Sequence, residues 1–170
     1  MKNKQKLVNY IFMGTLMALG VNPVAKAETT IQGPNLGVFG GVTFHTGSLI
    51  GISSTNTNPA GGFEANYRFP SNAIQVGAEY FTSGGNSQIV GKFDFYPTET
   101  FFVGALAGTT LGTGQNFVWG AETGLLFELG NGLQLGPKVE YFTGNTGSGP
   151  LSATGYDISA LALLRYNFAK

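Results

Sequence analysis

The sequence has no cysteine, a single histidine, and only 11% charged residues among its 170. Without cysteine no disulfide is available, so the chain must be held together by its fold alone. A soluble domain usually has about a quarter of its residues charged, so the low charge argues against an ordinary water-facing surface. Beyond the N-terminal segment there is also no apolar run of the roughly 20 residues that a membrane helix needs.

The N-terminal segment has the order of a secretory signal peptide. Lys2, Lys4 and Lys6 precede the apolar run at 10–21, which is followed by Ala25-Lys26-Ala27. This basic, apolar and small-residue order predicts cleavage after Ala27. We therefore expect a signal peptide at 1–27 and one domain at 28–170.

The charge balance of the expected mature chain is mildly acidic. Loss of residues 1–27 removes four lysines and leaves five basic against nine acidic residues, a net charge of 5 − 9 = −4. Phosphate binding needs clustered lysine and arginine. The sequence shows no such cluster, so nucleic acid is not expected as a partner.

After the signal the dominant pattern is alternation of apolar and polar residues with a period of two. This pattern, interrupted by glycine, asparagine, serine, threonine and proline, predicts an all-β chain. Eight strands are expected, at 36–44, 62–69, 73–81, 88–96, 100–109, 116–129, 132–142 and 155–170. In the last of them every even position from Tyr156 to Phe168 is apolar or aromatic.

The connections between these strands alternate between short and long. Short ones are expected at 70–72, 97–99 and 130–132, and long ones at 45–61, 82–88, 110–115 and 143–155. This layout is typical of an antiparallel up-and-down barrel whose two rims differ. Hairpin parity predicts that Arg68 pairs with Gln75, that Gly124 pairs with Lys138, and that Glu122 pairs with Glu140, because a one-residue slip would reverse the faces.

The placement of charge indicates which face is inside. Eleven of the fourteen charged residues after position 27 lie on the polar alternation, together with several glycines that suit a crowded interior. We expect these residues to form a charge network in the lumen: Glu64, Arg68, Glu79, Lys92, Asp94, Glu122, Glu128, Lys138, Glu140, Asp157 and Arg165.

The apolar alternation would then face lipid. Its aromatic residues gather near the two ends of the expected strands, around a middle of valine, alanine, leucine and isoleucine. Two such girdles are typical of transmembrane barrels, and only a closed barrel satisfies every backbone group in lipid. The pattern predicts an all-β, eight-stranded antiparallel up-and-down transmembrane β-barrel.

The chain resembles the small eight-stranded outer-membrane barrels, the group of the OmpA transmembrane domain and OmpX. The resemblance covers nearly all of the mature chain. It includes Gly155, Tyr166 and Phe168, which resemble the C-terminal aromatic-x-Phe signal read by the barrel-assembly machinery; Ala169-Lys170 after Phe168 departs from that ending. The resemblance implies a Gram-negative outer-membrane location, with lipids, lipopolysaccharide and the assembly machinery as partners, and a monomer.

Three functional classes remain open at this stage. Eight strands leave an interior just wide enough for side chains to fill, which favours a structural or surface protein with an ion-paired lumen. A narrow pore is the alternative: either cation-preferring, from the surplus of acids, or a channel for small solutes or hydrophobic compounds, with Pro137 as a lateral weak point in the wall. The third class is a lipid A-modifying enzyme built on His45, Ser48 and Glu64.

The structural or surface role is the one that we expect, without enzymatic activity. The sequence offers no catalytic, cofactor-binding or metal-binding motif. The long connections contain no lysine, arginine, aspartate or glutamate, so they are expected to be permissive loops and not capture sites for charged ligands.

Overall fold

The structure is a computed structural model and describes residues 32–49, 52–70, 73–112, 116–146 and 153–168. The expected signal peptide and Ala169-Lys170 lie outside these residues. The strands are β1 (Gly33–Leu49), β2 (Ile52–Arg68), β3 (Ile74–Ser83), β4 (Asn86–Phe95), β5 (Phe101–Leu111), β6 (Phe117–Leu125), β7 (Phe127–Gly130), β8 (Leu133–Thr146) and β9 (Ala153–Asn167). No helix among the described residues is long and apolar enough to cross a membrane.

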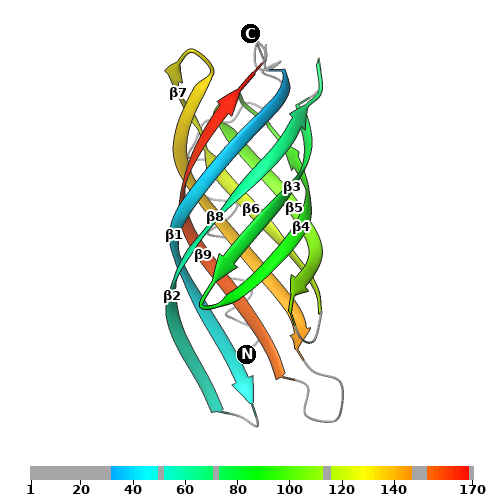
Figure 1. The fold of residues 1–170 in the computed structure, drawn as a ribbon, viewed down its shortest axis with the longest axis vertical. Helices are drawn as coiled ribbons and strands as arrows, with labels where there is room; N and C mark the ends of the chain where they lie inside the picture. The colour runs from blue at the N-terminus through cyan, green and yellow to red at the C-terminus, as the bar shows by residue number, and fades with distance from the viewer. Residues whose placement is uncertain (1–31, 50–51, 71–72, 113–115, 147–152, 169–170) are drawn as a thin grey trace, which may run out of the picture.

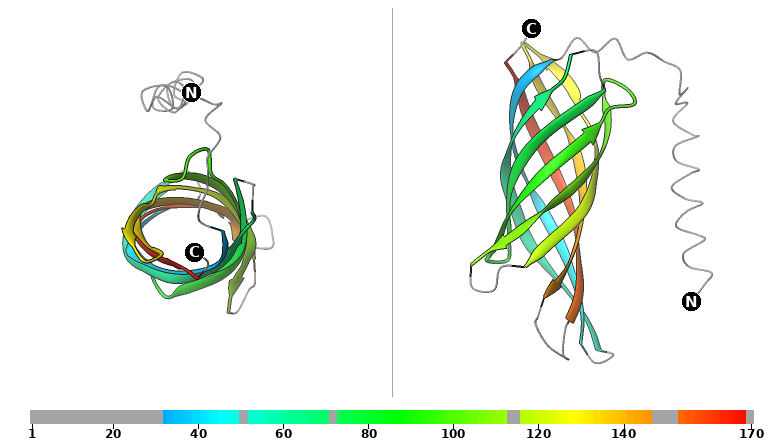
Figure 2. Two further views of the ribbon diagram at one scale, coloured as in Figure 1. Left: turned by 90° about the horizontal axis from the view of Figure 1, so that it is seen from above. Right: turned by 90° about the vertical axis from the view of Figure 1, so that its right-hand side faces the viewer.

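The strands form one closed antiparallel sheet. Strands β1 to β5 each pair with the next strand in the chain, β8 pairs with β9, and β9 closes the sheet by pairing with β1. β8 also pairs with both β6 and β7, which do not pair with each other. β6 and β7 are the two halves of one wall strand, so the wall has eight strands (Figures 1 and 2). The prediction of an eight-stranded up-and-down barrel is confirmed.

The register follows the hairpin parity. Arg68 lies opposite Gln75, and Phe69 donates its backbone N–H to Ile74 at 3.0 Å. Between the paired strands β6 and β8, Gly124 lies opposite Lys138 and Glu122 lies opposite Glu140. The short turn at 130–132 has three consecutive residues with positive φ, of which Asn131 is the non-glycine.

Two of the four long connections, at 45–61 and 82–88, were predicted wrongly. β1 and β2 stay paired as far as Leu49 and Ile52, so most of the expected loop at 45–61 is an extended hairpin (Figure 1). The expected loop at 82–88 contains only a two-residue turn, Gly84-Gly85, between β3 and β4. The serine, threonine and asparagine that suggested loops here continue the strands beyond the apolar part of the wall. We call this rim the hairpin end and the opposite rim the short-turn end.

The Gly84-Gly85 turn gives a first testable prediction. Both residues have positive φ, 57° and 86°, a backbone conformation that costs an L-residue about 1–2 kcal/mol. A Cβ on Gly85 would meet nothing within 4 Å, so Gly85→Ala isolates the backbone cost. We expect the free energy of unfolding in urea to fall by about 1–2 kcal/mol, whereas the neighbouring Asn86→Ala should change it by less than about 0.5 kcal/mol.

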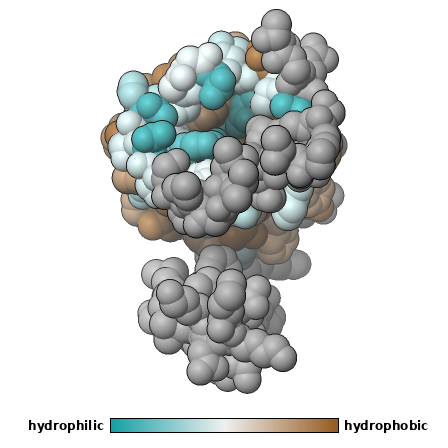
Figure 3. All heavy atoms as spheres, turned by 90° about the horizontal axis from the view of Figure 1, so that it is seen from below, coloured by the Kyte–Doolittle hydropathy of each residue, from teal (hydrophilic) through white to brown (hydrophobic). Residues whose placement is uncertain are grey.

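Side chains alternate between the two faces as the pattern requires. Large apolar and aromatic residues are exposed on the outer face, among them Phe63 (56%), Trp119 (55%) and Phe127 (52%). In β9, Ile158 and Leu164 point outward while Ser159 and Arg165 are buried. Seen from the hairpin end, polar residues gather around a hollow mouth and the apolar surface lies on the flank (Figure 3).

Pro137 lies in the wall with an exposed side chain. Because proline has no N–H to donate, the ladder from β8 is interrupted between the pairs Gly124–Lys138 and Phe127–Leu135. β8 itself continues, pairing Pro137 with Ala162 of β9. Leu126 separates β6 from β7, is only 1% exposed, and donates its N–H to Thr100 at 2.7 Å. The ladder is therefore interrupted beside the proline, and at this level Leu126 packs into the buried cluster that contains Tyr96 and Phe102.

Candidate functional site

The centre of the lumen is a layer of charged side chains in which Glu64 of β2 is the common partner. Its carboxylate accepts hydrogen bonds from Nε of Arg165 at 2.8 Å and from Nζ of Lys92 at 2.7 Å. Asn66 donates to the same carboxylate at 3.1 Å. Because a buried charge must be paired and hydrogen-bonded, these bonds account for a carboxylate that is 0% exposed.

Two lysines join the remaining acids of this layer. Lys92 of β4 also lies 2.8 Å from Glu122 of β6. Lys138 of β8 lies 2.8 Å from Glu79 of β3 and 2.6 Å from Glu140. Every one of these side chains has 0% exposure, so no water-sized path runs between them.

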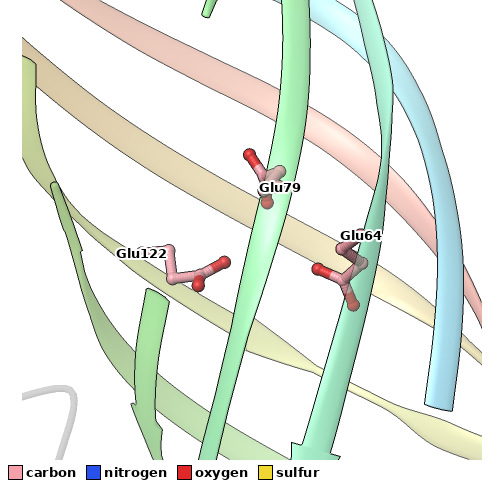
Figure 4. A group of neighbouring side chains, drawn as sticks. All are labelled: Glu64, Glu79 and Glu122. Carbon is pink, nitrogen blue, oxygen red and sulfur yellow. The ribbon is translucent and has the colours of Figure 1, made fainter. Parts of the chain in front are cut away.

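Glu64, Glu79 and Glu122 point toward one another from three strands (Figure 4). Their carboxylate oxygens lie within 4.8 Å of one another, a spacing that a metal ion could bridge. The two lysine ammonium groups already lie within hydrogen-bonding distance of all three carboxylates. Each of the three acids is therefore paired with a cation of the chain itself, and the cluster is a salt-bridge network.

The short-turn end of the lumen is closed by residues that the sequence analysis did not single out. Tyr96 follows β4, is 0% exposed, and packs 5.5 Å from Phe102. The guanidinium of Arg68 lies 3.8 Å from the centre of the Tyr96 ring, and Arg165 contacts the Tyr96 hydroxyl. Tyr96 shares the parity of Lys92 and Asp94, so the alternation contained the signal that could have found it.

Amides extend this network toward the short-turn mouth. Gln75 donates to Asp94 at 2.8 Å and accepts from Asn35 at 3.1 Å and from the hydroxyl of Tyr96 at 3.3 Å. Asn66 donates to Asn35 at 3.0 Å. These bonds fix the rotamers of the side chains on which the charged layer rests.

Above the charged layer, toward the hairpin end, the inward positions become apolar. Phe81 packs 5.6 Å from Phe142 and 6.1 Å from Phe39. Val90, Leu106, Val118 and Phe142 form a second buried cluster. The expectation of a polar, ion-paired lumen is therefore wrong in this part: the inward residue next to Glu79 is Phe81, next to Lys92 is Val90, and next to Glu140 is Phe142.

Eleven residues were predicted to form the lumen network. Seven are joined in the ion-paired layer: Glu64, Glu79, Lys92, Glu122, Lys138, Glu140 and Arg165. Asp94 is at its edge, 3.8 Å from Lys92, and Arg68 lies against Tyr96. Glu128 is exposed at the short-turn end, outside the network. Asp157 is near the hairpin end, where it hydrogen-bonds His45.

The candidate enzyme site is not assembled as the sequence suggested. The acid beside His45 is Asp157, which lies opposite it across β1 and β9. Glu64 instead lies inside the charged layer, bonded to Arg165 and Lys92. On β2, the residue opposite His45 is Asn56. Glu64 lies further along β2, deeper in the barrel, and therefore far from His45.

The residues of the predicted assembly signal lie on β9 and just beyond it. Tyr166 and Phe168 face outward at the short-turn end, with ring centres 5.1 Å apart. Gly155 lies at the other end of β9, opposite Gly47. Their role in assembly stays a prediction.

No protein-family model matches the sequence, and no curated protein matches it significantly. Among solved structures, the chain is similar to Neisserial surface protein A (NspA), with a TM-score of 0.60 at 15% identity, over 79% of this chain and 97% of that one. The fold is that of the small eight-stranded outer-membrane barrels.

Two weaker likenesses add nothing to that conclusion. The outer membrane protein AlkL in lipid bilayers has a TM-score of 0.48 at 15% identity, over 86% of this chain and 96% of that one. OprG from Pseudomonas aeruginosa has a TM-score of 0.45 at 11% identity, over 85% and 100%.

Proposed function

We propose that the chain is an integral outer-membrane β-barrel with a structural or surface role and a lumen that does not conduct. The observation that carries the proposal is the sealed lumen inside an apolar outer wall. A barrel wall with exposed phenylalanine, tyrosine and leucine suits lipid and is unsuited to water. Between the two mouths, the charged layer and the apolar layer above it leave the side chains of the salt bridges unexposed.

The two rims suggest an orientation. In bacterial outer-membrane barrels the short turns face the periplasm and the longer connections face outward. The short-turn end would then be periplasmic, and the hairpin end, with His45 and Asp157, would face the exterior. This orientation agrees with the expected signal peptide, which would export the chain as residues 28–170.

The partners proposed here are those that such a wall requires. The aromatic residues near each rim would anchor the barrel at the two interfaces of a membrane with lipopolysaccharide in its outer leaflet. Tyr166 and Phe168, exposed at the short-turn end, would be accessible to the barrel-assembly machinery during insertion. We propose a monomer, because the described strands close into one sheet, and a closed sheet has no edge to offer to another chain.

The narrow-pore alternative lacks support from the lumen geometry. An acidic ring can select cations only where an ion can reach it. Here the acids are bonded to Lys92, Lys138 and Arg165, and Phe39, Phe81 and Phe142 lie between them and the hairpin end. At the level of Pro137 the buried Leu126 packs in the same cluster as Tyr96 and Phe102, which disfavours a lateral path for a hydrophobic compound.

The proposal predicts that planar bilayers containing refolded residues 28–170 show no discrete conductance steps. Insertion must be verified first by the heat-dependent gel shift of a folded barrel. Glu122→Gln should leave the bilayer equally silent, because it removes a charge without opening the apolar layer. Reproducible cation-preferring steps in the unmodified chain, altered by Glu122→Gln, would overturn the proposal in favour of the narrow pore.

A further inference from the structure

A cavity of about 290 Å³ opens at the hairpin end of the barrel, above the sealed lumen. Its base is apolar and aromatic, formed by Phe81, Phe142 and Val118. The two phenylalanine rings pack on each other, tilted by 53° with centres 5.6 Å apart, and each residue is 3% exposed, so they form a closed apolar floor for the cavity. Figure 3 looks into this mouth and shows hydrophilic residues gathered around it.

The walls of the cavity are polar but almost uncharged. Thr43, Asn58, Gln88 and Asn116 line it, and each can donate and accept hydrogen bonds. They come from β1, β2, β4 and the approach to β6, so polar groups surround the space from several sides.

Gln88 of β4 is the clearest indication of a ligand. It is only 8% exposed, lines the cavity, and lies between Phe81 and Thr110 in the sheet register. Its amide has no hydrogen-bond partner among the described residues, whereas Thr43 and Ser159 bond each other at 2.8 Å. The amide can both donate and accept hydrogen bonds at the cavity wall, so a ligand with hydroxyl groups would find two partners on this one side chain.

The only charged group on the cavity wall among the described residues is the His45–Asp157 pair. The ring Nδ1 of His45 hydrogen-bonds Asp157, whose carboxylate keeps acceptor capacity for a hydroxyl. No lysine or arginine is among the described residues that line the cavity. A phosphate or carboxylate ligand would therefore find an acid and no strong cation.

We propose that this cavity binds a neutral sugar unit of hexose size. A sugar ring has an apolar C–H face for the Phe81–Phe142 base and hydroxyl groups for Gln88, Asn116 and Asp157. The polar walls of the cavity disfavour purely hydrophobic compounds, which fit smooth apolar pockets. A neutral sugar also suits walls that are almost uncharged. The volume is at the lower end of ligand sites, about 300 Å³ upward, which suits one sugar ring and not an extended chain.

The test is two-dimensional NMR of the labelled, refolded barrel in a phosphocholine micelle, since glucoside detergents would compete. Methyl glucoside, galactoside and mannoside are titrated separately. We expect saturable shifts of amides at Phe81, Gln88, Thr110 and Phe142 with at least one of them. Glucose 6-phosphate should shift the same amides at least tenfold more weakly than the neutral sugar.

Two variants make the test specific to the cavity. Gln88→Leu removes the unpartnered amide without burying a new polar group, and Asp157→Asn removes the charge but keeps the size; each should weaken sugar binding at least tenfold. Glu128→Gln, exposed at the opposite end, is the matched control and should bind as the unmodified barrel does. The gel shift must show that all three fold.

Titration with a trisaccharide distinguishes a free sugar from the end of a glycan as the natural ligand. If the trisaccharide binds tenfold more tightly than its methyl monosaccharide, the ligand is the end of a glycan; equal affinity indicates a free sugar, and both results support the site. Three results would overturn it: no saturable shift with any neutral glycoside, equal binding by Gln88→Leu, or shifts confined to the outer wall. None of these depends on conductance, so the binding site and the non-conducting role fail separately.

Discussion

Replacing Glu64 with glutamine is expected to lower the free energy of unfolding by about 3–5 kcal/mol, the usual cost of removing one partner from a buried ion pair. Glutamine keeps the size of the side chain, so little cavity is created. Arg165 at 2.8 Å would lose its charged acceptor, and Lys92 at 2.7 Å would lose one of the two carboxylates nearest to it, keeping Glu122 at 2.8 Å. The side chains of Arg165 and Lys92 are at most 1% exposed, so water cannot replace the lost carboxylate.

The measurement is urea unfolding of the barrel in lipid vesicles, followed by the fluorescence of Trp119. Glu128→Gln makes the same chemical change at an exposed site and should alter the free energy by less than about 0.5 kcal/mol. A loss below about 1 kcal/mol for Glu64→Gln would mean that the charged layer is hydrated and the lumen not sealed.

A double-mutant cycle assigns the loss to a particular pair. If Arg165 is the main partner, Arg165→Met should cost much less in the Glu64→Gln background than in the unmodified chain, because the guanidinium has already lost its acceptor. Coupling of about 0.5–3 kcal/mol is typical of residues in one network. Additive effects would assign the loss to Lys92 and the rest of the layer.

The wall of this barrel could be predicted from sequence because its inward and outward side chains alternate with a period of two residues. Each strand has one face toward water or charge and one toward apolar surroundings, and a one-residue slip would exchange them. That constraint alone determined the Arg68–Gln75 and Glu122–Glu140 pairs. The same alternation carries through β9, whose outward positions at Ile158 and Leu164 were predicted from parity.

Depth along the barrel was harder to predict than face. Parity showed that Asp157 and Glu128 lie on the inward face, but it did not show that both lie beyond the sealed part of the lumen. It also did not distinguish the apolar inward layer at Phe81 and Phe142 from the charged layer one step away. Depth requires the stagger between strands, which accumulates around a closed barrel and is not encoded in any one segment.

The hairpin end was misjudged for a compositional reason. Serine, threonine, asparagine and glycine are typical of loops, and 45–61 is rich in them. Outside an apolar wall, however, strands face water on both sides, so the same residues can continue a ladder without apolar alternation. The His45–Asp157 contact depends on this continuation, because the two residues are paired by β1 and β9. Without the extended strands, the sequence offered only Glu64 as an acid for His45.

The second large effect is expected at Gly136 on the inward face of β8. A Cβ at this position would overlap the backbone carbonyl oxygen of Leu125, and a backbone atom cannot move aside as a flexible side chain can. The overlap falls where the pairing of β8 with β6 and β7 is already interrupted beside Pro137. We expect Gly136→Ala to prevent the barrel from closing, with no heat-shifted species on a gel after refolding.

Gly91→Ala is the matched control for this change. Gly91 lies in the middle of β4 with its open side outward, and the nearest atom to an added Cβ is the carbonyl oxygen of Ala107 at 3.7 Å, an ordinary contact. Alanine also restricts the unfolded chain more than glycine does, so Gly91→Ala should fold with equal or slightly higher stability. If both variants refolded equally well, the wall at Leu125 and Gly136 would have to be wider than the structure shows, and Pro137 would again become a candidate lateral opening. A failure of Gly136→Ala alone would instead show that close backbone contact seals the barrel where proline interrupts its hydrogen bonds.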